Sequence, residues 1–219
     1  MRKFIGLSEA VGKIKDGMTI MIGGFLANGT PEKIIDEIVR QNLKGLTIIC
    51  NDTGYTDRGI GKLIVNNIAK KVYASHIGTN KVTGEKMKSG EIEVVLTPQG
   101  TLIEQIRAGG FGLGGVLTRT GLGTAVEEGK QKIIIDDQEY IIEKPLHADF
   151  ALIYGDVVDE LGNIQYQGTT RNFNIMMAYA ADTVIVEAAK KVTIGSIDQN
   201  NVNISGILID YIINEEEIL

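Results

Sequence analysis

The sequence predicts an α/β protein with an open, mostly parallel β-sheet flanked by helices and with one inserted β-hairpin. Short apolar runs of strand length alternate with amphipathic helical patterns, as in parallel sheets that helices cover on both faces. Residues 133–142 differ, because two apolar stretches flank a polar turn at Asp136 and Asp137. Glycine is abundant at 27 of 219 residues and proline is scarce at 3, which indicates tight backbone sites and no linker. We therefore expect one domain over residues 1–213 and an acidic C-terminal tail at 214–219.

The first elements are expected in the order helix, strand, helix. A helix is expected to open at residues 8–11 with Ser8 as its N-cap. The apolar run 18–22 is typical of a buried parallel strand. The next helix is expected to begin with Thr30 as N-cap and Pro31 at its first position, because proline has no N–H to lose there. Its apolar stripe consists of Ile34, Ile35, Ile38 and Val39.

The same reading continues to the end of the domain. Further strands are expected at residues 46–50, 72–75, 93–97, 150–154, 164–166 and 183–187, with a turn at 161–163. Further helices are expected at residues 98–108 and 172–181. This βα alternation is the basis for the parallel sheet.

Composition and charge exclude several classes of protein. The net charge of −6 argues against a nucleic-acid binder, and a single cysteine excludes a disulfide framework and a cysteine-cluster metal site. His76 and His147 lack metal-ligand spacing, so no metal site is expected. The uncharged stretch 17–31 is shorter than the ~20 apolar residues that cross a bilayer. Residues 1–6 do not resemble a secretory signal, so a cytoplasmic protein is expected.

The loop at residues 23–31 is the first candidate site. It joins a buried strand to a helix N-terminus, where backbone N–H groups and the helix dipole favour anions. Gly23, Gly24 and Gly29 let a phosphate or carboxylate approach the backbone closely. The alternative is a tightly packed βα turn with no ligand. Open α/β sheets bind ligands at the carboxyl ends of their strands, which keeps the binding hypothesis open.

Other chemistry-bearing residues are more isolated. Gln99 also follows a strand, so its amide either reaches the same crevice or satisfies the first turn of its own helix. The glycine-rich segment 109–115 indicates backbone that passes close to a ligand or a partner subunit, or a flexible loop. Glu187 is either catalytic or, as we favour, a partner for a nearby backbone group or arginine. Cys50 ends an apolar run and is expected to be a buried hydrophobic residue.

Several motifs together resemble one family. They comprise 21–25 with 29–32, 97–102, 106–110 with 120–124, 148–152, and 171–174. In this order and spacing the chain resembles the α subunit of family I CoA-transferases, of the 3-oxoacid and short-chain fatty-acid type. The resemblance covers nearly the whole chain and implies the open α/β fold of that family. It departs at Arg119, where proline is expected, and in the variable loop that holds Phe111 and Leu113.

The resemblance implies a covalent mechanism that needs neither ATP nor a metal. A glutamate attacks an acyl-CoA thioester, forms an acyl–glutamyl anhydride and then a glutamyl-CoA thioester. That glutamate lies in a Ser-Glu-Asn-Gly motif of the β subunit, and the tetrapeptide is absent from this sequence. Glu104 and Glu187 are then poor candidates for the nucleophile, and an α2β2 assembly is implied. Coenzyme A and acyl-CoA enter as substrates, with no permanently bound cofactor.

The resemblance also assigns roles to residues of this chain. Gln99 corresponds to a glutamine that holds the substrate carboxylate or stabilises the developing oxyanion. The residues implied in CoA contact are Gly24, Phe25, Leu26, Ala27, Asn28, Gly29 and Thr30.

Alternatives remain beside this reading. The chain also resembles 3-oxoadipate CoA-transferase α subunits, and a sugar-phosphate isomerase on a related fold would share anion-binding loops. A non-catalytic interaction protein would be expected to lose those loops. Acetate, acetoacetate and butyrate remain equal candidates for the acyl group.

Overall fold

An eight-stranded sheet organises the computed structural model, which describes residues 3–213. Along the sheet the order is β11 (Tyr211–Ile213), β10 (Ala181–Val192), β8 (Ala148–Asp159), β1 (Thr19–Ile22), β2 (Leu46–Ile49), β3 (Ala69–Ala74) and β4 (Glu93–Leu96). Every neighbouring pair in this order is parallel, and only β9 (Ile164–Gln165) runs antiparallel, against β8. The predicted open, mostly parallel sheet is therefore confirmed.

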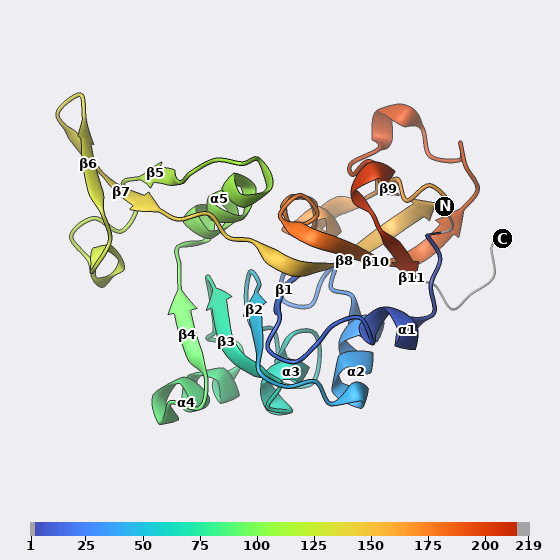
Figure 1. Cartoon of the computed structure of the whole chain (residues 1–219), viewed down its shortest axis with the longest axis horizontal. Helices are drawn as coiled ribbons and strands as arrows, with labels where there is room; N and C mark the ends of the chain where they lie inside the picture. The colour runs from blue at the N-terminus through green and yellow to red at the C-terminus, as the bar shows by residue number, and fades with distance from the viewer. Residues whose placement is uncertain (1–2, 214–219) are drawn as a thin grey trace.

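Helices cover both faces of this sheet (Figure 1). One face packs against α1 (Leu7–Val11), α2 (Glu32–Gln41), α3 (Gly61–Val65) and α4 (Lys81–Ser89). The other face packs against α5 (Gln99–Gly110) and α6 (Asn174–Met177). Four short 3-10 helices complete the described chain: Ala125–Glu127, Gly168–Arg171, Gln199–Asn201 and Gly206–Leu208. Two apolar cores result, one on each side of the sheet, which explains why the strands are apolar on both faces.

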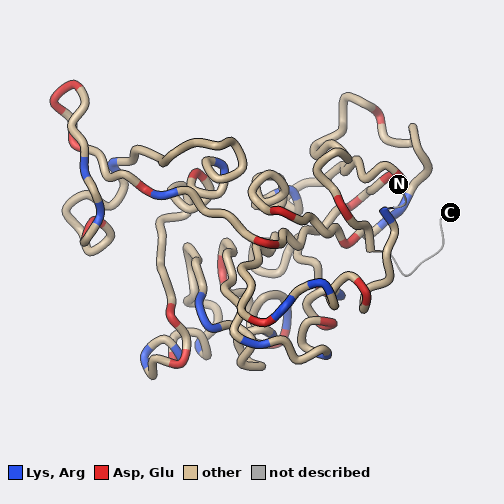
Figure 2. The backbone as a smooth tube through the Cα atoms, in the orientation of Figure 1, with Lys and Arg blue, Asp and Glu red and all other residues tan. Residues whose placement is uncertain are grey.

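The predicted hairpin is part of an arm that projects from the body beyond α5 (Figure 1). It is a three-stranded antiparallel sheet of β5 (Val116–Thr118), β7 (Gln138–Glu143) and β6 (Lys132–Ile135). Asp136 and Asp137 have φ values of 49° and 59°, as a type I′ turn requires. The tip of the hairpin is acidic (Figure 2). Every residue of β6 is exposed, and Ile134 has the largest exposed fraction in the strand, at 69%.

Some predicted boundaries were wrong. Helix α1 begins before Ser8, and the Ser8 hydroxyl accepts a hydrogen bond from Arg40 instead of capping its own helix. Helix α2 begins at Glu32, with Pro31 rather than Thr30 at the cap position. The helix expected at 172–181 is only α6: the side chains of Asn172 and Asn174 at its start bond to other segments, and β10 already begins at Ala181. The acidic tail at 214–219 lies outside the described residues.

The parallel strands bring four connections to one edge of the sheet. The loop after β1, Asn51 and Asp52 after β2, Ser75 after β3 and Gln99 after β4 all follow carboxyl ends of adjacent strands. This is the edge at which open α/β sheets bind ligands.

Candidate functional site

The loop after β1 contains a strained two-residue turn. The backbone N–H of Phe25 donates to the Asn28 oxygen at 3.0 Å, and the N–H of Asn28 donates back to the Phe25 oxygen at 2.9 Å. Between them Leu26 and Ala27 have φ values of 46° and 68°, which residues other than glycine and asparagine rarely adopt. Such a conformation costs about 1–3 kcal/mol per residue and persists only where the surroundings enforce it.

Side chains from distant segments enforce this turn. The buried carboxylate of Asp52 accepts the N–H of Leu26 at 3.0 Å, and its other oxygen accepts the N–H of Gly54 at 2.8 Å. The Asn172 amide accepts the N–H of Gly24 at 3.1 Å and donates to the Asn28 carbonyl at 3.0 Å. The turn is therefore clamped from both sides by polar side chains of its own chain.

Two glycines of the loop are required because other segments of the same chain pack directly against them. A Cβ on Gly23 would lie 1.7 Å from Oδ1 of Asn174, and one on Gly29 would lie 2.6 Å from the Thr170 oxygen. Asn174 is fully buried and donates to the carbonyls of Gly29 and Thr170 at 2.9 and 2.8 Å. The packing that we weighed as the alternative to ligand binding is thus present, whether or not a ligand also binds.

The N-terminus of α2 already holds a carboxylate of this chain. Glu187 lies within β10, which continues to Val192, and its Oε2 accepts the N–H of Ile34 at 3.0 Å. Burial raises the pKa of Glu187 to about 7, although hydrogen bonds from the Ile34 and Lys33 N–H groups and the Lys33 charge lower it. The expectation that Glu187 serves a nearby backbone group is confirmed. The helix N-terminus that we expected to attract a ligand anion is therefore occupied.

Gln99 lies in a small cavity of about 220 Å³. Its Nε2 donates to Oδ1 of Asn51 at 2.7 Å, so its side chain turns toward the strand ends and not along its own helix. The cavity is lined by Phe25, Leu26, Asn51, Asp52, Ser75, His76, Thr79 and Gln99. The structure thus brings Gln99 to the same crevice as the loop after β1, which is one of the two placements that the sequence left open.

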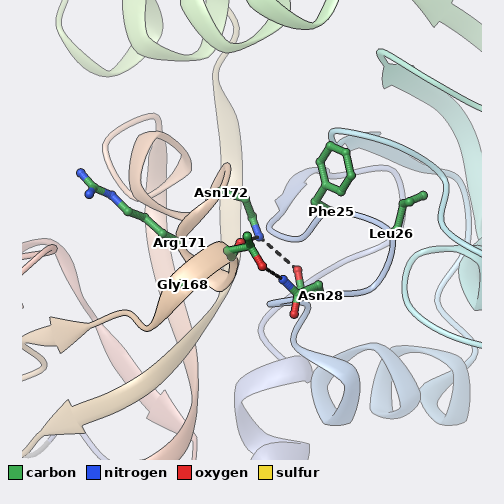
Figure 3. A pocket seen from close by; sticks show the side chains of 7 residues that line it. Phe25, Leu26, Asn28, Gly168, Arg171 and Asn172 are labelled. Carbon is green, nitrogen blue, oxygen red and sulfur yellow. Dashed lines mark hydrogen bonds between the residues drawn. The ribbon is translucent and has the colours of Figure 1, made fainter.

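A larger, open cavity of about 790 Å³ lies on the other side of the same turn. Its walls are Phe25, Leu26 and Asn28 from the loop and Gly168, Thr169, Arg171 and Asn172 from the segment before α6. In Figure 3 the Phe25 ring stands between Asn172 and Leu26, while Arg171 points away from the turn. Phe25 is 44% exposed, so an aromatic face is open to whatever enters this cavity.

Sequence reasoning missed several residues of the small cavity. Asn51 and Asp52 follow directly after the buried run that ends at Cys50, which is the signal that could have found them. His76, which lacks metal-ligand spacing, also lines the cavity, and its segment pairs with that of Asp52 through a parallel bridge. Cys50 is buried as expected, and burial raises the pKa of its thiol.

The glycine-rich segment 109–115 owes part of its composition to its own chain. A Cβ on Gly109 would lie 2.0 Å from the Leu146 oxygen, and one on Gly110 would lie 2.6 Å from Cβ of Tyr179. The Phe111 ring stacks on Tyr179 with 5.0 Å between centroids. Neither a ligand nor a partner is therefore needed to explain the first two glycines.

The remaining candidates lie outside the crevice. Glu104 pairs with Arg107 at 2.7 Å on the exposed side of α5. Arg119 donates to the Gln138 side chain at 3.3 Å within the arm. Among residues 3–213, no group of three or more His, Cys, Asp and Glu side chains is placed to hold a metal ion. No helix within the same range is both long enough and apolar enough to cross a membrane.

Relatives with solved structures share the fold. An acyl-CoA transferase from Escherichia coli O157:H7, solved as a thioester complex with CoA, superposes with a TM-score of 0.85 at 21% identity. The match covers 96% of this chain but 46% of that one, so this chain spans about half of its length. Glutaconate coenzyme A-transferase from Acidaminococcus fermentans superposes with a TM-score of 0.84 at 18% identity, covering 96% of this chain and 74% of that one.

Sequence comparison identifies the family. The model for the coenzyme A transferase family matches residues 5–215. The chain is 60% identical to the acetoacetyl-CoA:acetate/butyrate CoA transferase alpha subunit of Clostridium acetobutylicum, over 92% of each chain. It is 51% identical to the acetate CoA-transferase subunit alpha of Escherichia coli K12, over 98% of each. With a crevice at the strand ends and identity of this extent, the chain belongs to the coenzyme A transferase family.

Proposed function

We propose that this chain is the α subunit of a heteromeric CoA-transferase that moves CoA between a short-chain acyl-CoA and a carboxylic acid. Acetate, acetoacetate and butyrate are the proposed acids, because the relatives of highest identity described above are named for them. The observation that carries the proposal is the small crevice in which Gln99 faces the turn at Phe25 and Leu26. A cytoplasmic location is part of the same proposal.

Gln99 is proposed to hold the substrate carboxylate or the developing oxyanion. Its amide has two N–H donors, and one of them is used by Asn51 at 2.7 Å. The bond to Asn51 orients the amide and leaves the second donor for the cavity. A preoriented donor of this kind stabilises negative charge that appears on a thioester or anhydride oxygen during acyl transfer.

The nucleophile is proposed to come from a β subunit with a Ser-Glu-Asn-Gly motif, in an α2β2 assembly. Its carboxylate would attack the thioester carbonyl and expel CoA thiolate, forming an anhydride. The thiolate would then attack the glutamyl carbonyl, release the acid and leave a glutamyl-CoA thioester. Glu187 does not suit this role, because it is buried and already accepts the backbone N–H of Ile34.

The loop from Gly24 to Thr30 is proposed to contact CoA through exposed side chains and not through free backbone N–H groups. The N–H groups of Gly24, Phe25, Leu26 and Asn28 already have acceptors in the chain. What the loop offers is the exposed ring of Phe25 and the open cavity beside it. An apolar wall of this kind suits the pantetheine part of an acyl-CoA.

The test follows the loss of acetoacetyl-CoA in the presence of acetate. This chain alone is compared with the chain co-expressed with a subunit that carries the Ser-Glu-Asn-Gly motif. We expect activity only in the pair. Turnover by this chain alone would refute the proposed division of labour. The same preparations, offered 3-oxoadipate or a sugar phosphate, test the two alternative activities.

A further inference from the structure

The strained turn stands between two cavities of different size. Phe25 and Leu26 line both the cavity of about 220 Å³ and the one of about 790 Å³. Figure 3 shows the Phe25 ring between Asn172 and Leu26. These two side chains are therefore the partition of the crevice.

The partition is held rigidly. Leu26 carries a positive φ, and its N–H is bound by the buried carboxylate of Asp52 at 3.0 Å. Asn172 holds the other end of the turn through the carbonyl of Asn28 at 3.0 Å. A side chain on such a turn cannot move aside by a backbone shift without breaking these bonds. The backbone that carries Phe25 and Leu26 is therefore fixed, and a longer ligand meets these two side chains.

The small cavity is large enough for a short carboxylic acid and offers it both polar and apolar side chains. Its volume of about 220 Å³ equals that of about seven water molecules at ~30 Å³ each. Its lining includes the amide side chains of Asn51 and Gln99, the Asp52 carboxylate, and the apolar side chains of Phe25 and Leu26. An acid whose carboxylate lies at Gln99 would run its chain toward these two apolar side chains.

We propose that Phe25 and Leu26 set the longest acyl chain that the enzyme accepts. This rests on the proposed function, because it takes the acid to lie at Gln99. The isobutyl group of Leu26 limits the depth of the small cavity, and the Phe25 ring keeps it separate from the larger one. Acids up to about the length of butyrate then fit, and longer linear acids clash with the partition.

The experiment measures kcat/KM of the reconstituted complex for acetate, butyrate, hexanoate and octanoate. Leu26→Ala is expected to raise the hexanoate-to-acetate ratio of kcat/KM at least 10-fold, the scale of fitting one or two extra methylenes. Phe25→Ala removes the other apolar side chain that lines the small cavity and is expected to raise the same ratio. Alanine at position 26 keeps the side-chain Cβ and therefore the same backbone strain, whereas glycine would relax it.

The control is Leu161→Ala, which removes an exposed leucine between β8 and β9 that lines neither cavity. It is expected to leave the length profile unchanged. An unchanged profile in Leu26→Ala and Phe25→Ala, with acetate still transferred, would overturn the inference. An equal loss of kcat/KM for every acid in an intact complex would also overturn it. If Leu26→Ala does not assemble, Phe25→Leu gives the same comparison. Failure of the wild-type complex to transfer CoA to acetate would instead refute the proposed function.

Discussion

Replacing Glu187 by glutamine should flatten the pH dependence of stability. The carboxyl group lies 8% exposed in β10 and accepts the N–H of Ile34, and burial raises its pKa from 4.5 to about 7. The folded protein therefore binds a proton that the unfolded chain has released at intermediate pH. Stability falls as the pH rises from about 4.5 to about 7, and the cost is fully present above the folded pKa.

The magnitude follows from the same two values. Each tenfold difference in proton affinity corresponds to about 1.4 kcal/mol. The difference between 4.5 and about 7 then amounts to about 3 kcal/mol. Most of it, roughly 2.5 kcal/mol, is lost between about pH 5 and about pH 8. A glutamine keeps an oxygen that can accept the Ile34 N–H but has no proton to lose.

The assay is urea unfolding of the wild-type chain and of Glu187→Gln, each at about pH 5 and at about pH 8. We expect the wild type to lose roughly 2.5 kcal/mol more than the variant between them. Glu104→Gln is the matched control, since that carboxylate is on the exposed side of α5 beside Arg107. It should lose stability in parallel with the wild type. Parallel curves for the wild type and Glu187→Gln would refute the reasoning.

Three further substitutions test the crevice. Gln99→Ala should lower kcat of the assembled enzyme by about 10²-fold, which is the scale of losing one oxyanion donor. An unaltered kcat would contradict that role, and Gln199→Ala, on an exposed 3-10 helix, is the control. Gly29→Val should raise the KM for acyl-CoA, because its side chain meets the Thr170 backbone at 2.6 Å and displaces the loop; a folded variant with wild-type KM would leave the loop as a turn only. Asn174→Ala should destabilise the chain by about 3 kcal/mol in thermal unfolding, since it leaves buried partners unpaired; a loss below about 1 kcal/mol would contradict this.

Much of the fold was predictable because apolar runs are local signals. The strand at 18–22 and the turn at Asp136 and Asp137 were expected within a residue or so of where they lie. No helix was expected at α3 or α4. Helix α3 spans only Gly61–Val65, and in α4 only Thr83 is buried, so neither carries a clear apolar stripe. The strands β8 and β10 extend beyond their apolar centres into residues such as Lys190 and Lys191, which a strand prediction from hydrophobicity does not include.

Some residues of the candidate site could also be predicted from the sequence, and others could not. Gln99 and the loop after β1 were predicted, because each follows a strand and parallel strands end at one edge. The partners that shape the loop were not, because they depend on contacts between distant segments. Asn172 is separated by 148 residues from Gly24, whose N–H it accepts. The occupied N-terminus of α2 was missed for the same reason, since Glu187 reaches it from 153 residues away.

The arm has a consequence for how the chain must be produced. Strand β6 is the outermost strand of its sheet, and its three consecutive isoleucines are exposed. An apolar edge strand is a template for pairing with further chains. Copies of this chain at high concentration are therefore expected to associate through this edge and to be lost to precipitation. A lower level of synthesis would therefore leave a larger fraction of this chain usable.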